Sequence, residues 1–363
     1  MAHLTDSTPI ELASHTWFYI GGQWVRNNAE TYLEGAMYVE HYQPVDVLDA
    51  APIVAFHGGV QTGTNFVSTP DGRRGWLHDF LRAGFEVYLV DQPERGRSGH
   101  RLSNDGPEKF QRYSAERTEA MFTATAQARR WPLAHRHSQW PGDGRMGDEV
   151  FEQFFASQVE MLDDRLAIET LTRDAGVALV EKLGSAILLT HSQSGPFGWL
   201  IADACPDKVK AVVAVEPNGP PFFDVQHLGN SGEWYRYSEK LERPYGITRA
   251  PLSFEPAVTP ANPLVPQLMP AEHPDQHVDG YVQAPPARQL PNLKMPIVIV
   301  VAEASYHAVY DHVTSAFLAQ AGVEHDYIAL ADHGIEGNGH MVMLEQNNHE
   351  IADLLIDWLS SKL

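Results

Sequence analysis

Ser192 is the residue whose position is most typical of a catalytic nucleophile. It lies in residues 191–195, HSQSG, which follow the apolar run 186–189 and precede a stretch compatible with a helix. A serine on a sharp turn from a strand into a helix exposes its hydroxyl, as in the G-x-S-x-G nucleophile elbow, although Thr190 and Ser194 replace the usual glycines here. Because serine at a strand end is also typical of a helix cap, catalysis requires a base, an acid and an oxyanion site as well.

Two histidines that could act as the general base lie in one glycine-rich loop, at residues 332–340. An imidazole with a pKa of about 6.5 can take the serine proton and return it to the leaving group. We expect His340 to be this base, because small residues precede it, with activity rising through a pKa of about 7. His333, in the same loop, remains the alternative.

Two carboxylates follow apolar runs and could orient the histidine. Glu216 comes directly after the run 211–215, and Glu303 comes directly after the run 296–302. Open α/β sheets build their sites at the carboxyl ends of the strands, so both positions are suitable. We expect Glu216 to be the acid because Pro217 forces a sharp exit from its strand, and we keep Glu303 as the alternative.

A second glycine-rich turn could supply the oxyanion site. Gly58 and Gly59 follow the run 53–56, and backbone N–H groups there would face the same edge of the sheet as Ser192. Preorganised donors of this kind stabilise the charge that develops during acyl transfer. We expect the amides of Gly59 and Gln193 to take this role, because serine, acid and histidine follow one another in the chain order of α/β-hydrolases.

Six short apolar runs alternate with stretches of helical pattern. Such runs are typical of strands buried on both faces of a parallel sheet. They comprise residues 52–56, 85–90, 186–189, 211–215, 296–302 and 327–330. The clearest helix is C-terminal, and its apolar face consists of Ile351, Leu354, Leu355, Trp358 and Leu359. The alternation predicts an α/β fold with helices on both faces of a mostly parallel, doubly wound sheet.

The ends of this sheet and its long connections complete the expected architecture. Residues 17–25 and 37–42 predict an antiparallel N-terminal edge, with a bend at Gly21-Gly22 and a turn at Asn27-Asn28. We expect one domain over residues 1–363, capped by long insertions at about residues 100–180 and 218–292. Within the first insertion, a core-facing helical stripe is predicted from the spacing of Phe151, Phe154, Phe155, Val159 and Leu162.

Composition excludes several classes of protein. The chain has 363 residues, 43% of them hydrophobic, and a formal net charge of −21. This charge repels nucleic acid and anionic membranes, and no segment approaches the roughly 18 apolar residues of a membrane span. Cys205 is the only cysteine, which excludes disulfides within the chain and cysteine-rich metal sites. Without a visible signal peptide we expect a cytoplasmic protein, or a periplasmic or secreted one if such a peptide has been removed.

These motifs resemble the α/β-hydrolase superfamily and, within it, the bacterial esterase 713 group. The similar pieces are spread over most of the chain. They comprise residues 57–58, 61–63, 69–73, 75–76, 91–92, 95–98, 191–195, 215–217, 333–341 and 347–348. The sequence departs from the group at Gly59-Val60, where the esterase has two adjacent cysteines, and the long insertions match poorly.

The resemblance implies hydrolysis of a carboxylic ester by a triad of Ser192, His340 and Glu216. It also implies that the protein needs no cofactor or metal and forms a homodimer. We therefore expect a serine hydrolase that cleaves an uncharged, small-molecule carboxylic ester through an acyl-enzyme. Because the insertions would shape the pocket, a lactonase or an amidase with the same triad remains an alternative. A non-catalytic binding protein of hydrolase-like fold is a third possibility.

Two other patterns indicate loops. Residues 142–147 satisfy the dinucleotide-binding pattern G-x-G-x-x-G but do not follow a strand, so we expect no nucleotide there. His135 and His137 are suitable metal ligands but have no further ligands at recognisable spacing. We interpret residues 91–99 as a structural loop held by Arg95 and Arg97.

Overall fold

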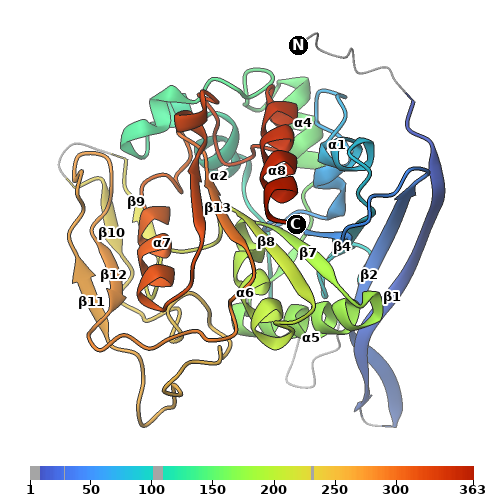
Figure 1. Cartoon of the computed structure of the whole chain (residues 1–363). Coiled ribbons are helices and arrows are strands. Elements are labelled where there is room, and N and C mark those ends of the chain that lie inside the picture. The colour runs from blue at the N-terminus through green and yellow to red at the C-terminus, as the bar shows by residue number, and fades with distance from the viewer. Residues whose placement is uncertain (1–8, 28, 101–108, 230–232) are drawn as a thin grey trace.

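The fold is built on one eight-stranded sheet (Figure 1). The computed structural model describes residues 9–27, 29–100, 109–229 and 233–363. The strand order is β1-β2-β4-β3-β7-β8-β13-β14, in which β1 and β2 are antiparallel to their neighbours and the others are parallel. The strands are β1 (Leu12–Asn27), β2 (Glu30–Pro44), β3 (Ile53–Phe56), β4 (Val87–Asp91), β7 (Ala186–His191), β8 (Val209–Val215), β13 (Ile297–Val301) and β14 (Asp326–Ala329). All six apolar runs are therefore confirmed as strands.

Helices cover both faces of the sheet, as predicted. The inner strands are almost entirely buried, which explains their near-continuous valine and isoleucine. One face packs against α5 (Arg165–Leu183), α6 (Gly195–Ala204) and α7 (Asp311–Gln320). The other face packs against α1 (Trp76–Arg82) and α8 (Asn348–Lys362). Figure 1 shows α1 and α8 above the sheet and α5 and α6 below it.

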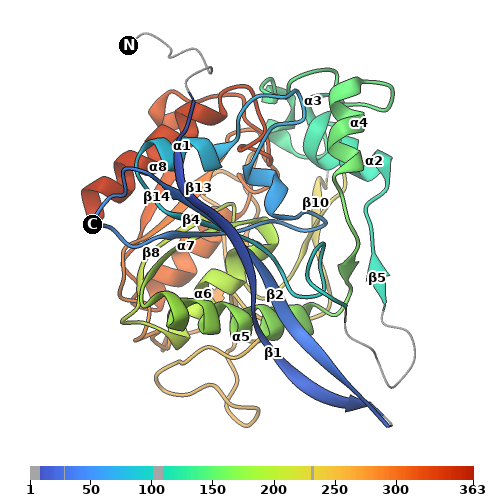
Figure 2. The ribbon, with the colours of Figure 1, turned by 90° about the vertical axis from the view of Figure 1, so that its right-hand side faces the viewer.

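The N-terminal pair forms a long hairpin at the edge of the sheet. Its register pairs Tyr19 with Tyr38, and Gly21 and Gly22 adopt φ of +69° and +79°, which glycine tolerates. The bend is thus where the sequence predicted it, whereas Asn28 of the predicted turn lies outside the described residues. Figure 2 shows the hairpin running along one side of the molecule and projecting beyond the sheet.

The first long connection carries short elements and one error in our prediction. Its elements before α5 are β5 (Phe110–Gln111), α2 (Ala115–Thr118), the π-helix η2 (Glu119–Thr123), α3 (Thr125–Ala128), the 3₁₀-helix η3 (Pro132–Arg136), α4 (Glu149–Ala156) and β6 (Met161–Leu162). The predicted helical stripe ends with α4, so Val159 and Leu162 do not belong to that helix. Leu162 instead pairs with Phe110 in a two-stranded ribbon. Because α5 packs on the sheet face, only the part of this connection before it can cover the sheet edge.

The second long connection has little helix. It contains two hairpins, formed by β9 (Val225–His227) with β10 (Tyr235–Tyr237) and by β11 (Pro266–Met269) with β12 (Gly280–Gln283). The remaining elements are the 3₁₀-helices η1 (Gly63–Phe66), η4 (Ser192–Ser194) and η5 (Leu330–His333). Among the described residues, no helix is both long and apolar enough to span a membrane.

Candidate active site

Ser192 lies on a sharp turn between β7 and α6. Its φ is +56°, a left-handed conformation that is unfavourable for serine and is typical of functional sites. Ser194 stabilises the turn, because its hydroxyl accepts from the His191 amide at 2.8 Å and contacts the Phe56 carbonyl at 2.8 Å. The serine that replaces the usual glycine at position 194 is therefore compatible with the turn.

Gly195 is needed for the close packing predicted at this turn. A Cβ atom at Gly195 would lie 2.5 Å from the Cβ of Pro217 and 2.6 Å from its Cα. The amide of Asn218 donates to the Ser192 carbonyl at 2.8 Å, which ties the end of β8 to the serine turn. The sequence therefore brings Ser192 and the segment after Glu216 into direct contact.

Glu216 and His340 form a buried hydrogen-bonded pair. Nδ1 of His340 lies 2.5 Å from Oε2 of Glu216, and both side chains are nearly inaccessible to solvent. Glu216 also accepts from the Ala302 amide at 2.9 Å and the Ser305 hydroxyl at 2.7 Å. The bond to the carboxylate assigns the imidazole proton to Nδ1, so Nε2 is the nitrogen that can accept a proton.

Burial opposes the charged form of each group of this pair, whereas hydrogen bonds from neighbouring donors favour the carboxylate form of Glu216. Burial raises the pKa of Glu216, with the nearby Asp311 adding to the rise, whereas the Ala302 and Ser305 hydrogen bonds oppose it. Burial also lowers the pKa of His340 well below its ordinary value. His340 is therefore a neutral imidazole at neutral pH, which is the form that a general base requires.

Two further histidines hold the His340 ring and its backbone. Nε2 of His191 lies 3.0 Å from the His340 carbonyl oxygen. The ring of His307 stacks on that of His340, with centroids 4.8 Å apart and planes 7° from parallel. His307 is fixed in turn by Asp311 at 3.1 Å and by the Tyr310 hydroxyl at 3.1 Å. These contacts restrict the orientation of the imidazole before any substrate binds.

Tyr306 connects the serine to the histidine and was missed by sequence reasoning. Its hydroxyl lies 3.2 Å from Nε2 of His340, and the Ser192 side chain is close enough to oppose the rise in the pKa of Tyr306. Burial raises the pKa of Tyr306 well above its ordinary value, so it remains a protonated donor. The sequence offered one indication of this role, because Tyr306 lies in the loop after the predicted strand 296–302, at the edge of the sheet where the site was expected. We call Ser192, Glu216, Tyr306 and His340 the serine cluster.

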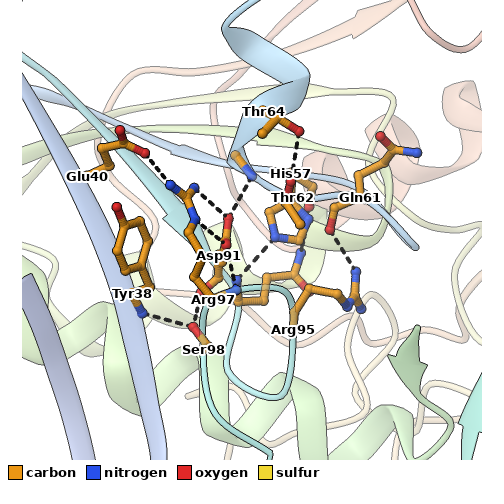
Figure 3. Close-up of polar contacts among 12 residues, drawn as sticks. Tyr38, Glu40, His57, Gln61, Thr62, Thr64, Asp91, Arg95, Arg97 and Ser98 are labelled. Atoms are coloured by element: carbon orange, nitrogen blue, oxygen red, sulfur yellow. Dashed lines mark hydrogen bonds and ion pairs between the residues drawn. The ribbon is translucent and has the colours of Figure 1, made fainter. Parts of the chain in front are cut away.

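Gly59 and Gln193, the expected oxyanion donors, both line the cavity beside Ser192. The two loops are joined by Arg95, a fully buried side chain whose contact with Gln61 is drawn in Figure 3. Its guanidinium donates to the Gly58 carbonyl at 3.4 Å, the Gln61 carbonyl at 3.3 Å and Oε1 of Gln193 at 3.2 Å. The Gly58 carbonyl and the Gly59 amide belong to one peptide plane, so holding the carbonyl also fixes the direction of the N–H.

Arg95 belongs to a second polar group, which we call the arginine cluster: the buried Asp91 and Arg95, and the partly exposed Arg97. Asp91 accepts from the Gly63 amide at 2.9 Å and from Nε of Arg97 at 2.8 Å. The Arg97 guanidinium also stacks on Tyr38, 3.9 Å from the ring centre, and thereby links the loop to β2 (Figure 3). The predicted structural role of residues 91–99 agrees with these contacts.

The structure does not bring the two alternative residues into the site. Glu303 forms an ion pair with Arg136 and accepts from the Gly337 amide at 3.1 Å. His333 is exposed at the end of η5. Neither residue contacts His340 or Ser192, so the geometry favours Glu216 as acid and His340 as base.

Residues 142–147 and the histidines at 135 and 137 are the two patterns that we interpreted as parts of loops. Residues 142–147 lie between η3 and α4 and follow no strand. His135 contacts the Pro132 carbonyl at 2.8 Å, and His137 contacts Glu345 at 2.9 Å. These contacts give both histidines structural partners.

One set of described residues could hold a metal ion. Glu216, His307 and His340 offer ligand atoms that all lie within 4.8 Å of one another. However, Glu216 and His340 are bonded to each other, and both ring nitrogens of His307 are occupied by Asp311 and Tyr310. A metal would have to replace these bonds, so the arrangement fits proton transfer better than metal ligation.

Ser192 opens into a cavity of about 170 Å³. One part of its wall is apolar and aromatic, and the rest is polar. The apolar part includes Val60, Met121, Phe122, Phe154, Met161 and Met341. Phe122 packs against His340, with ring centroids 5.5 Å apart. The cavity can therefore hold an apolar chain next to the serine hydroxyl.

The fold and this site define a class of protein. Residues 53–354 match the model of the alpha/beta hydrolase family, and the chain belongs to that family. The chain is 40% identical to the fungal protein "Probable secreted lipase phiG" of Fungal sp. (strain ATCC 74256), over 96% of this chain and 90% of the relative. It is also similar in structure to a bacterial esterase, with a TM-score of 0.65, 21% identity and 98% of each chain covered.

These comparisons bear on two of our expectations. The resemblance to the α/β-hydrolases and their esterase-like group is confirmed. The expectation of a cytoplasmic protein is not supported, because the fungal relative is named as a secreted protein. The lack of a recognisable signal-peptide pattern was therefore not sufficient evidence for a cytoplasmic localisation.

Proposed function

We propose that this protein is a carboxylic ester hydrolase that acts through an acyl-enzyme on Ser192. The observation that carries the proposal is the buried bond between Nδ1 of His340 and Glu216, because it leaves Nε2 as a neutral acceptor in the cavity that Ser192 also lines. The similarity to a lipase and to an esterase supports ester chemistry over other hydrolytic reactions of the fold.

In the proposed acylation step, Oγ of Ser192 attacks the ester carbonyl carbon while its proton passes to Nε2 of His340. The charge on the carbonyl oxygen is stabilised by the amides of Gly59 and Gln193. The tetrahedral intermediate then collapses, the bond to the alcohol oxygen breaks, and His340 returns the proton to that oxygen. Glu216 stabilises the imidazolium that exists between the two proton transfers.

Deacylation repeats these steps with water as the nucleophile. His340 takes a proton from water as the water oxygen attacks the acyl carbonyl carbon, and returns it to Oγ of Ser192 when the acyl bond breaks. The products are a carboxylic acid and an alcohol. A lactone or an amide would react through the same groups, so the pocket decides between these substrates.

We also propose that the protein forms a homodimer, and the edge hairpin supports this proposal. Strand β1 is an edge strand and exposes large apolar side chains, including Trp17 (64% exposed) and Trp24 (74% exposed). Long apolar edge strands pair readily with another chain. Sedimentation analysis of the wild type and of Trp17→Ser/Trp24→Ser tests this proposal, and a monomer in both would contradict it.

Hydrolysis of p-nitrophenyl butyrate, followed by stopped-flow absorbance, tests the ester hydrolase proposal. We expect a burst or steady release of p-nitrophenol from the wild type and none from Ser192→Ala. Cys205→Ser is a matched control. It removes the only thiol of the chain, which does not line the cavity, and should retain activity. Equal turnover by Ser192→Ala and the wild type would refute the proposal, and a panel of esters, lactones and amides would separate the alternatives.

A further inference from the structure

The cavity beside Ser192 carries an excess of positive charge. Three side chains that line it are permanently charged: Arg117, Arg165 and Asp224. The lining therefore holds two cations and one anion, although the whole chain has a net charge of −21. Positive charge in the pocket of an acidic protein is unexpected unless a ligand of opposite charge uses it.

The histidines of the lining do not alter this balance. Burial lowers the pKa of both His191 and His227 to about 3. Burial also lowers the pKa of His340 well below its ordinary value. All three are therefore neutral at neutral pH, and the cavity charge comes from the arginines and Asp224 alone.

Asp224 is engaged mainly by arginines outside the lining, and Arg165 adds a smaller electrostatic contribution that also lowers the pKa of Asp224. The fully buried Arg243 contacts it at 2.5 Å, and Arg249 lies 4.0 Å from its other carboxylate oxygen. Within the described part of the chain, no carboxylate forms an ion pair with Arg117 or Arg165. Neither guanidinium group is held in such an ion pair, so each can form hydrogen bonds with a ligand.

Arg117 lies close to the reaction centre. Its guanidinium stacks on Tyr113, 4.2 Å from the ring centre, and this fixes the direction of the side chain. The hydroxyl of Tyr113 is near the expected oxyanion loop, because a Cβ atom at Gly59 would lie 3.3 Å from it. The charge of Arg117 also opposes the rise that burial causes in the pKa of Tyr306, a residue of the serine cluster. Arg117 can therefore reach a ligand whose carbonyl lies at Gly59.

Arg165 contributes from a second element. It is the first residue of α5, is half-buried and lines the same cavity. The preceding Asp164 does not pair with it, because its carboxylate caps the helix by accepting from the Ala167 amide at 2.9 Å. The cavity thus has guanidinium groups from two different elements, and apolar walls that include Met121 and Phe154.

We infer that the substrate carries a carboxylate in addition to the ester group, and that Arg117 and Arg165 bind this carboxylate while the ester lies at Ser192. A half-ester of a dicarboxylic acid, with an apolar chain between its two ends, has this chemistry. Arginine is suited to the task because its planar donors match a carboxylate. The inference rests on the proposed ester hydrolysis and replaces our expectation of an uncharged substrate.

The test compares two esters with acyl chains of equal length. p-Nitrophenyl hemiglutarate carries a terminal carboxylate, whereas p-nitrophenyl valerate has a terminal methyl group. We expect wild-type kcat/KM to be roughly 10- to 100-fold higher for the hemiglutarate, the usual effect of charge-assisted hydrogen bonds. Arg117→Gln and Arg165→Gln should each raise KM for the hemiglutarate roughly 10-fold and remove most of the preference for the hemiglutarate over the valerate.

The control variant is Arg173→Gln, on the same helix as Arg165 but paired with Asp174 and outside the cavity. It should leave both substrates unaffected. Equal kcat/KM for the two esters, with no effect of the cavity variants, would overturn the inference while leaving ester hydrolysis intact. Turnover of valerate that persists in Ser192→Ala would instead refute the proposed function.

A binding measurement tests the carboxylate site without turnover. Monomethyl glutarate is titrated calorimetrically into Ser192→Ala and into the same variant carrying Arg117→Gln and Arg165→Gln. We expect binding to Ser192→Ala that weakens at least roughly 10-fold in the triple variant and as NaCl is raised. Absence of binding to Ser192→Ala, or equal binding to both proteins, would overturn the inference.

Discussion

The serine cluster and the arginine cluster lie at the same edge of the sheet, and both are largely buried. In the serine cluster, hydrogen bonds run from Glu216 through His340 to Tyr306, and Ser192 lies beside Tyr306 and lines the cavity. In the arginine cluster, the Asp91 carboxylate and the Arg97 guanidinium are bonded to each other within the protein. Burial of polar groups alone therefore does not distinguish a reactive site from a structural one.

The difference lies in where each network ends. A network that ends at a cavity presents its last group to a ligand, whereas a network whose charged groups bond to other groups of the protein stabilises a loop. Arg95 combines the two cases, because its partners are carbonyl groups but these belong to the loops that carry Gly59 and Gln193. It supports the expected oxyanion site from behind.

The largest expected difference between the clusters is in catalysis. His340→Ala removes the only group in the serine cluster that can accept the Ser192 proton, so kcat for p-nitrophenyl butyrate should fall by roughly 10⁴-fold or more. The variant should remain folded, which its circular dichroism spectrum and thermal midpoint would show. A folded variant with unchanged kcat would contradict the assignment of His340.

Asp91→Ala is expected to act on stability. It removes the acceptor for Arg97 and for the Gly63 amide, so the free energy of unfolding should decrease by about 2–3 kcal/mol. The kcat of the protein that remains folded should change little, because Asp91 does not line the cavity. Urea unfolding measures the loss, and Asp174→Ala, which breaks an exposed pair with Arg173, should cost less than about 1 kcal/mol. Loss of kcat in folded Asp91→Ala would remove the distinction between the clusters.

Sequence patterns predicted those site residues that directly follow a strand. Ser192 and Glu216 directly follow buried strands, so their positions at one edge followed from the parallel order. Tyr306 and Arg95 lie further along their loops, where no periodicity reveals which side chain turns inward. Their roles depend on contacts between distant segments, which one sequence does not show.

The same reasoning explains the error in the first long connection. Helical spacing continued past Phe155 to Leu162, but α4 ends at Ala156 and Leu162 pairs with β5. Pairing between two segments overrode the local apolar pattern. Likewise, the charge of the cavity arises from Arg117 and Arg165, which are 48 positions apart by residue number (165 − 117). Only the folded chain brings them to one cavity.

Tyr306→Phe removes one hydroxyl from the serine cluster and retains the aromatic ring that packs against Phe122 and Trp131. We expect kcat to decrease by roughly 10-fold, because a donor that contacts both Ser192 and His340 is lost. The rate of labelling by a fluorophosphonate should decrease in parallel, since labelling also requires activation of Ser192. Tyr235→Phe, in the second connection, is a control that keeps Ser192 and His340 unchanged. Unchanged labelling of Tyr306→Phe would show that its hydroxyl only fills space.

The smallest expected effect is the response to mild acid, and it separates buried from exposed imidazole. Because burial lowers the pKa of His340, the base stays deprotonated as the pH falls through the ordinary histidine value. Therefore kcat/KM, which reports the free enzyme, should change less than about 2-fold between pH 7 and pH 6. This differs from the rise near pH 7 that the sequence alone suggested. The measurement uses p-nitrophenyl butyrate with initial rates corrected for p-nitrophenol ionisation, and thermal midpoints at each pH verify that the protein stays folded. A half-maximal loss at about pH 6.5 would mean that His340 titrates like a histidine in water, and that the serine cluster is more hydrated than its contacts indicate.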